Sequence, residues 1–115
     1  MKNLSKLQQL TDAVYAAELA KVADLNRQEQ QLRQRLAELK APPTPDGISP
    51  FALAGADLKW QSWIAESRRA LNLELSRVLA AKERARAGLS TALGKQQAVK
   101  KLIENQSLNR RNHTS

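Results

Sequence analysis

Apolar residues recur at helical spacing along the first part of the chain. Leucines and valines stand three, four or seven residues apart from Leu4 to Leu39, as on one face of an α-helix. From Val22 onward they form heptads, whereas nearer the start they are shifted in phase by one residue. No glycine or proline occurs in residues 1–41, so we expect one helix over about residues 3–40.

A second and clearer heptad pattern runs along the other half of the chain. Two rows of residues, each with members seven apart, have the spacing of the a and d positions of a coiled coil, and polar residues interrupt only the second row. The first row comprises Ile64, Leu71, Val78, Ala85, Ala92 and Val99, and the second comprises Arg68, Leu75, Lys82, Leu89, Gln96 and Ile103.

The expected limits of this second helix follow from its flanking residues. The Ser-Pro pair at positions 49–50 is typical of an N-cap and a first helical residue, while Gly55 is expected to delay firm helix until about Ala56. The polar tail, residues 109–115, is expected to fray. The sequence therefore predicts a second helix over about residues 51–108.

All prolines of the chain lie between the two patterns, within residues 42–50. A proline-rich turn at 41–50 would join the two helices, because neither apolar seam is wide enough to form a core alone. We therefore predict an all-α fold with a single domain, residues 1–115. Its architecture is a two-helix antiparallel coiled-coil hairpin with a longer second helix.

Symmetric pairing about this turn predicts which part of the hairpin is left uncovered. Facing residues would have numbers that sum to about 90, so that Val22 meets Arg68 and Leu4 meets Ala85. Beyond that point the second helix would continue alone for about 20 residues, or about 30 Å. An apolar seam that continues without its intrachain partner needs another partner.

The basic charge is concentrated in the second half of the chain. The net charge is +8; residues 1–49 carry 7 Lys and Arg against 6 Asp and Glu, and residues 50–115 carry 12 against 5. This distribution points to an anionic partner surface, and we place the expected contacts on the overhang. The apolar contacts are Leu89, Leu93, Val99, Leu102 and Ile103, and the basic contacts are Arg84, Arg86, Lys95, Lys100 and Lys101.

Trp60 and Trp63 stand about one helical turn apart near the proline-rich segment. One interpretation is that they close the open end of the hairpin together with Phe51 and Leu58. The other is that they form an exposed anchor for a second partner, because Trp is enriched at binding hot spots. The sequence leaves both interpretations open.

Groups that could support catalysis or metal binding are sparse. The only histidine is His113, in the polar tail, and the chain has no cysteine. With no phosphate-binding glycine loop and no clustered carboxylates, we expect a protein that is not an enzyme and that has no cofactor and no metal. No apolar run approaches the about 18 residues of a membrane span, and no apolar signal segment stands at the start, so a cytoplasmic location is expected.

A series of short motifs occupies the segment from Trp60 to Leu102. The motif positions are Trp60 and Trp63, Leu71 and Asn72, Ala80, Glu83 and Arg86, Gly94 and Lys95, and Ala98 and Leu102. This segment, roughly 43 of the 115 residues, resembles the FliJ/YscO family of small basic helical-hairpin proteins of flagellar and virulence type III export. It departs from the family pattern at Leu93, where an aromatic residue is expected, and at Lys95, where an arginine is expected.

The resemblance implies a stalk similar to the two-helix coiled coil of the rotary ATPase γ subunit. Family members insert the paired ends of the hairpin into the pore of the hexameric export ATPase, promote its assembly and activity, and contact the export gate protein. Some also handle export chaperones. The overhang contacts would then meet the pore, Trp60 and Trp63 would meet the gate, and the location would be cytoplasmic and peripheral to a membrane export apparatus.

Three alternatives remain from the sequence. A homodimer could bury the overhang and have only a structural role, and an export-chaperone escort would bind disordered substrate segments. A nucleic-acid-binding hairpin is the third, which the absence of a recognition fold and of aromatics interleaved with the basic residues disfavours.

Overall fold

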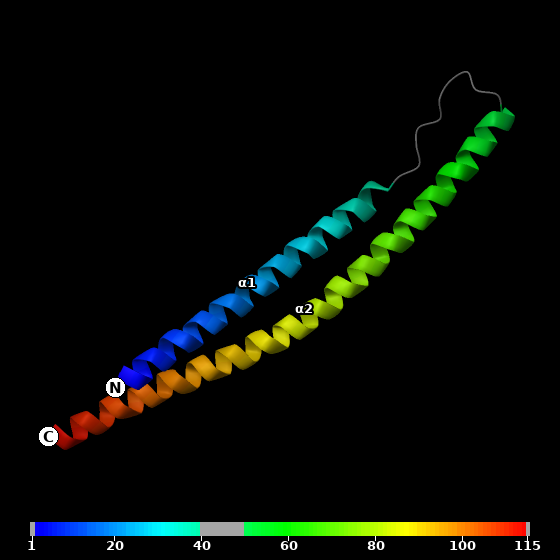
Figure 1. Ribbon diagram of the computed structural model, residues 1–115. Coiled ribbons are helices and arrows are strands. Elements are labelled where there is room, and N and C mark those ends of the chain that lie inside the picture. Colours follow the sequence, from blue (N-terminus) through cyan, green and yellow to red (C-terminus); the bar gives the residue numbers. More distant parts are fainter. Residues whose placement is uncertain (1, 40–49, 115) are drawn as a thin grey trace. The chain divides into compact units, whose positions relative to one another are not determined.

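The computed structural model describes residues 2–39 and 50–114, and these form two α-helices. Helix α1 is Lys2–Glu38 and helix α2 is Pro50–Thr114 (Figure 1). No β-strand occurs in the two described ranges. The predicted all-α class is therefore confirmed, as is the longer second helix, with 65 residues against 37.

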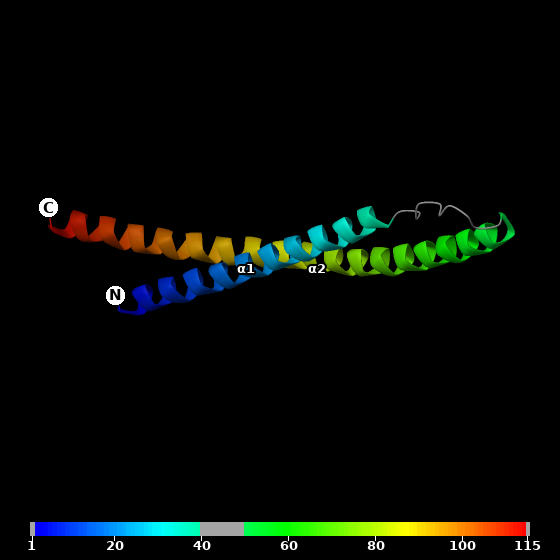
Figure 2. The same ribbon diagram turned by 90° about the horizontal axis from the view of Figure 1, so that it is seen from above.

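The chain divides into two compact units, each of which pairs a segment of α1 with a segment of α2. The first unit comprises residues 1–26 and 81–115, and the second comprises residues 27–80. Within each unit the two helical segments run in opposite directions, and they lie side by side in Figure 1 and Figure 2. The antiparallel helical hairpin predicted from the heptad patterns is thus present.

The helix limits agree with the prediction at α1 and differ from it at both ends of α2. α1 ends at Glu38, within two residues of the expected position. α2 begins at Pro50, so the delay expected from Gly55 is wrong, and it continues to Thr114, so the frayed tail is wrong as well. The turn predicted at 41–50 lies, except for Pro50, outside the described residues.

The less exposed face of α1 keeps one heptad phase along the whole helix. Its side chains follow one another at alternating intervals of three and four residues, without a break. They are Leu4, Gln8, Thr11, Tyr15, Glu18, Val22, Leu25, Glu29, Leu32, Leu36 and Leu39. The phase shift expected near the start is therefore wrong. The seam continues there with polar residues, and Leu7 and Val14 lie on its flank.

Thr11 shows how a polar side chain can occupy this seam. Only 8% of its surface is exposed, and its Oγ1 lies 3.0 Å from the carbonyl oxygens of both Leu7 and Gln8. The hydroxyl therefore donates its hydrogen bond within α1. Since a buried hydroxyl without an acceptor costs about 1–3 kcal/mol, this local bond allows the position to be buried without help from α2.

The two predicted rows of α2 are confirmed at every position but one. The buried members are Leu75, Ala85, Ala92 and Val99. All others except Arg68 are half-buried, whereas Arg68 is exposed and Ser67 takes a half-buried position instead. Exposure of the guanidinium avoids the cost of removing an unpaired charge from water.

The pairing register differs from the symmetric one. In the first unit the side-chain amide of Gln96 donates a 2.7 Å hydrogen bond to the Asp12 carboxylate, and Leu4 and Ile103 border the same hollow. Facing residue numbers therefore sum to about 107 rather than about 90. The prediction that Leu4 meets Ala85 is wrong, because Ala85 instead borders a hollow with Glu18 and Leu25, in the fifth turn of α1 and beyond.

The residues at the seam explain this offset. The symmetric register would bury the charge of Arg68 against Val22, whereas the observed one places α1 against the stretch of α2 whose heptad phase is unbroken, from Leu71 to Ile103. The 11 residues between Glu38 and Pro50 also allow it. At about 3.3 Å per residue such a segment can reach well over the about 25 Å by which α2 starts beyond α1.

α2 therefore extends further beyond α1 at its start than at its end, where about nine of its residues pass the start of α1 (Figure 1). In the second unit, Arg35 near the end of α1 borders a hollow with Glu74 and Arg77 of α2. Residues 50–66 of α2 consequently have no residue of α1 opposite them, as Figure 1 and Figure 2 both show. The overhang of about 20 residues predicted at the end of α2 is therefore wrong in its start, near Ala85, and in its length.

Two glycines of α2 form a matched pair for a stability measurement. A methyl group added at Gly94 meets nothing within 4 Å, whereas one added at Gly88 would lie 2.9 Å from Oε2 of Glu18. We expect Gly94→Ala to raise the free energy of unfolding by about 0.5–1 kcal/mol, because alanine loses less backbone entropy on folding. Gly88→Ala should gain less, since the Glu18 carboxylate must move aside.

Urea unfolding followed by circular dichroism at 222 nm would compare the two glycine variants. Equal gains at the two positions would contradict the close approach of Glu18 to Gly88.

Candidate partner-binding surfaces

The predicted contacts on the second half of α2 divide into two groups within the first unit. Val99 is only 5% exposed, and Leu89 and Ile103 are half-buried, so these three side chains belong to the seam with α1. The exposed members are Arg84, Arg86, Leu93, Lys95, Lys100, Lys101 and Leu102. Leu93 and Leu102 are nine residues apart and therefore lie on opposite flanks of α2. The surface is basic with separate leucines and has no continuous apolar stripe of the kind expected.

The first unit carries most of the net charge. Its residues include 11 Lys and Arg against 5 Asp and Glu, a net of +6, whereas residues 27–80 include 8 against 6, a net of +2. Among the predicted basic contacts, Arg86 has its Nη1 3.5 Å from Oε1 of Glu83, one turn earlier in the same helix. An exposed pair of this kind contributes little to stability, so Arg86 can exchange Glu83 for a partner's carboxylate at small cost.

Trp60 and Trp63 form an aromatic pair near the start of α2. Their ring centroids are 5.0 Å apart and the rings are tilted by 32°. Trp60 is half-buried, while Trp63 has 51% of its surface exposed. The closing cluster expected with Phe51 and Leu58 is wrong, because these two side chains are 91% and 68% exposed. The second interpretation, an anchor for a partner, stays a prediction.

The prediction from sequence missed an apolar flank of the first unit. Leu7, Leu10 and Val14 of α1 follow one another at intervals of three and four residues, so they share one side of the helix, and all three are exposed. From the sequence, Leu7 and Val14 are expected to lie on the face that contacts α2, because the residues that do occupy the seam between them, Gln8 and Thr11, are polar. A heptad count backward from the buried Leu32 would have placed Thr11 in the seam and these residues beside it.

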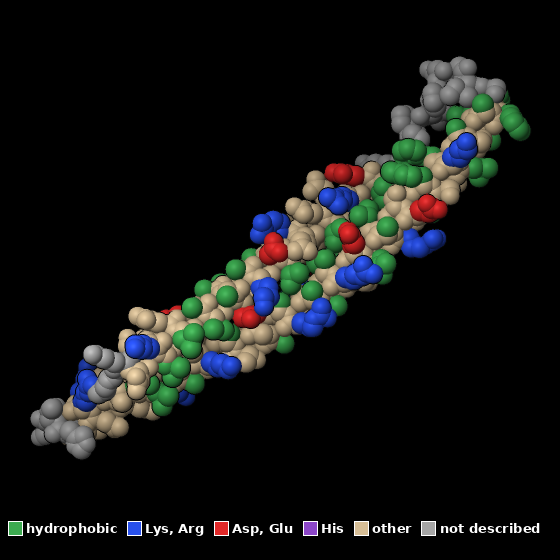
Figure 3. Space-filling model, in the orientation of Figure 1, with side chains coloured by type: hydrophobic (Ala, Val, Ile, Leu, Met, Phe, Trp, Pro, Cys, Tyr) green, Lys and Arg blue, Asp and Glu red, His purple; other side chains and the backbone are tan. Residues whose placement is uncertain are grey.

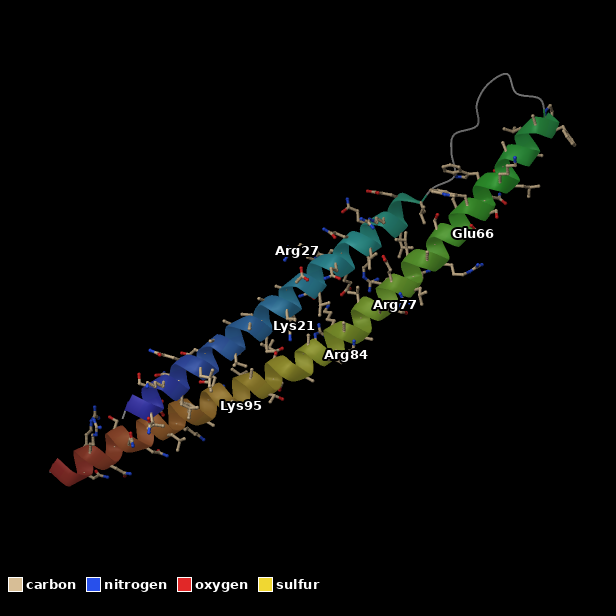
Figure 4. All side chains as sticks on the ribbon, viewed as in Figure 1. Lys21, Arg27, Glu66, Arg77, Arg84 and Lys95 are labelled. Carbon is tan, nitrogen blue, oxygen red and sulfur yellow. The ribbon has the colours of Figure 1, made fainter. Side chains whose placement is uncertain are left out.

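A hollow further along the first unit shows which residues of α2 adjoin this flank. It is shallow, has a volume of about 470 Å³, and is bordered by Glu18, Lys21, Asp24, Leu25, Ala81, Arg84, Ala85 and Gly88. Figure 4 labels Lys21 on α1 and Arg84 on α2, where the two helices lie next to each other. Lys21 of α1 and Gly88 of α2 border this hollow together. Because the helices are antiparallel, two heptads toward the start of α1 correspond to two heptads toward the end of α2, and this places Leu7 beside Leu102.

Within residues 2–39 and 50–114, no group of three His, Cys, Asp or Glu side chains could hold a metal ion. Over that same part of the chain, neither helix is long and apolar enough to span a membrane. The side chain of His113 lies outside what the structure describes. No family model, no curated protein and no solved structure matches this chain.

Proposed function

We propose that this chain is a non-enzymatic stalk component of a type III protein export apparatus, of the flagellar or the virulence kind. It would act in the cytoplasm, at the membrane-bound apparatus, by promoting the assembly and activity of the hexameric export ATPase. The export gate protein is a second partner, and export chaperones are further ones. The resemblance of residues 60–102 to the FliJ/YscO family supports this assignment of partners.

The observation that carries the proposal is the pairing of the two chain-terminal segments in one strongly basic unit. Members of the family insert the paired ends of their hairpin into the ATPase pore, and here residues 1–26 and 81–115 are paired and carry a net charge of +6. A charge of this size steers association with an acidic pore. The part proposed to enter the ATPase pore is therefore this pair of helical segments, in place of the single helix expected from the sequence.

The contacts proposed for each partner are the exposed residues of each unit. In the first unit they are Arg84, Arg86, Leu93, Lys95, Lys100, Lys101 and Leu102. In the second unit the exposed ring of Trp63, next to Trp60, is proposed to meet the gate protein.

Turnover by the export ATPase of the same organism, titrated with this protein at about 150 mM salt, tests the proposal. Wild-type protein is expected to stimulate turnover, and Leu93→Asp/Leu102→Asp to lose most of the stimulation. Both leucines are exposed, by 37% and 51%, so this variant should keep its fold. Leu58→Asp, at a 68% exposed position of the second unit, is the matched control and should stimulate like the wild type. The proposal would be contradicted if the wild type neither stimulated turnover nor co-eluted with the ATPase.

A further inference from the structure

The heptad register places apolar side chains of both helices on one flank of the first unit. They are Leu7, Leu10 and Val14 of α1 and Ala98 and Leu102 of α2, and we call this set the leucine groove. Figure 3 shows hydrophobic side chains along the line where the two helices meet. The exposed fractions of the four larger side chains are 40%, 60%, 42% and 51%, in the order Leu7, Leu10, Val14, Leu102.

These side chains do little for the hairpin itself. The seam beside them is made of Gln8, Thr11 and Tyr15 on α1. Polar residues therefore occupy the positions at which leucines would stabilise the pairing of the helices, and the leucines lie at positions that are exposed to solvent. Exposed apolar surface gains about 25 cal/mol per Å² when something covers it. An apolar patch of a few hundred Å² rimmed by polar residues is typical of an interaction site.

Charge around the groove defines the chemistry of what would cover it. Three exposed lysines, Lys6, Lys95 and Lys101, lie on the same side of the first unit as the groove. The hollow that continues it is bordered by Lys21 and Arg84 and by the two acidic residues Glu18 and Asp24. From this complementarity we propose that the leucine groove binds an α-helix of a partner protein whose apolar stripe is flanked by Asp and Glu. This inference does not rest on the export proposal.

The shape of the flank favours a helix over a flat surface. Two parallel cylinders leave a groove between them that a third helix fills, whereas a lipid surface would touch only the crests. The groove runs on into the shallow hollow bordered by Ala81, Ala85 and Gly88, where the Glu18 carboxylate lies beside Gly88. From Leu7 to Lys21 the footprint is about 21 Å long, which is four turns of a partner helix.

A second copy of the chain is a poorer occupant. Two such grooves brought face to face would oppose the same three lysines, Lys6, Lys95 and Lys101, and like charges so close repel.

The test uses the full chain and two fluorescent synthetic helices of about 21 residues, each with leucine in a heptad stripe. One peptide has Glu at the flanking positions and its twin has Lys there. Fluorescence anisotropy at low salt should show binding of the Glu peptide, at least about tenfold tighter than that of the Lys peptide. Leu10→Asp should weaken binding at least about fivefold, and Lys6→Glu/Lys101→Glu should weaken it and flatten its salt dependence.

Leu58→Asp is the control substitution for this titration and should bind the Glu peptide like the wild type, since it lies in the second unit. Circular dichroism melting confirms that each variant is folded. Equal binding of both peptides would overturn the proposal, because charge would then play no part. Two other outcomes would also overturn it. One is that the wild type binds vesicles with about 30% anionic lipid and Leu10→Asp does not; the other is that the wild type has twice the monomer mass in light scattering and Leu10→Asp has the monomer mass.

Discussion

Ala92→Asp is expected to separate the two helices of the first unit. Ala92 is the least exposed of the core residues, with 3% of its surface accessible, and it lies in the seam with α1. A carboxylate at this position would be removed from water without a designed partner, at a cost of about 3 kcal/mol or more. Because small domains have a total stability of only about 5–15 kcal/mol, the helical signal and the unfolding midpoint should both fall sharply.

Ala98→Asp is the matched control for this substitution. Ala98 is exposed on the same helix, so the change has the same effect on helix propensity, about 0.7 kcal/mol or less, and buries no charge. Urea unfolding of both variants isolates the contribution of burial as the difference between them. Similar small losses in both would contradict the observed register, since a symmetric hairpin leaves both positions beyond the start of α1.

Cysteines introduced at Leu4 and Ile103 are expected to cross-link within one chain. These residues border the same hollow in the first unit, and the chain has no cysteine of its own to compete. A short bis-maleimide added to Leu4→Cys/Ile103→Cys should therefore join the two sites in most molecules. Intact mass and gel mobility under denaturing conditions measure the yield, and dilution separates links within a chain from links between chains.

The pair Leu4→Cys/Ala85→Cys is the control for the cross-link. Symmetric pairing places these two residues face to face, whereas in the structure Ala85 is about 27 Å along α2 from the position opposite Leu4. The reagent should not join them. A high yield for this pair with a low yield for the first pair would establish the symmetric register instead.

The contact faces of the helices could be predicted wherever large apolar residues occupy them. On α1 the heptads from Val22 onward include the buried Leu32, and on α2 the rows named from spacing alone include Leu75 and Val99. At these positions burial of apolar surface dominates the energy, and the helical period decides which residues share a face. Within these heptads Arg68 was misplaced, because spacing takes no account of the cost of burying its charge.

The register could not be predicted in the same way. A heptad seam looks nearly the same after each shift by a repeat, so the spacing of leucines selects a face and not a partner. What distinguishes one register from another here is a small number of specific contacts, such as the hydrogen bond from Gln96 to Asp12. The candidate surfaces depend on the register, which is why the residues of an expected overhang proved to include the buried Val99.

The polar start of the α1 seam explains why the leucine groove escaped prediction. Leu7 and Val14 have the spacing of a contact face, and the residues that occupy the seam, among them Thr11 and Glu18, do not look like core residues. Thr11 becomes acceptable there only through its own hydrogen bonds to the α1 backbone. A pattern of apolar residues cannot reveal a bond of that kind.

The contact between Glu18 and Gly88 helps to select one alignment of the two helices in the first unit. Helices with a smooth heptad seam can slide past each other by one repeat, about 10 Å, and meet an equivalent surface. Here such a slide would move the Glu18 carboxylate from the space beside Gly88 to Ala81 or Lys95, where a side chain already stands. A missing side chain at one position of α2 therefore makes one alignment differ from its neighbours, by a small energy because the carboxylate is the flexible end of its side chain.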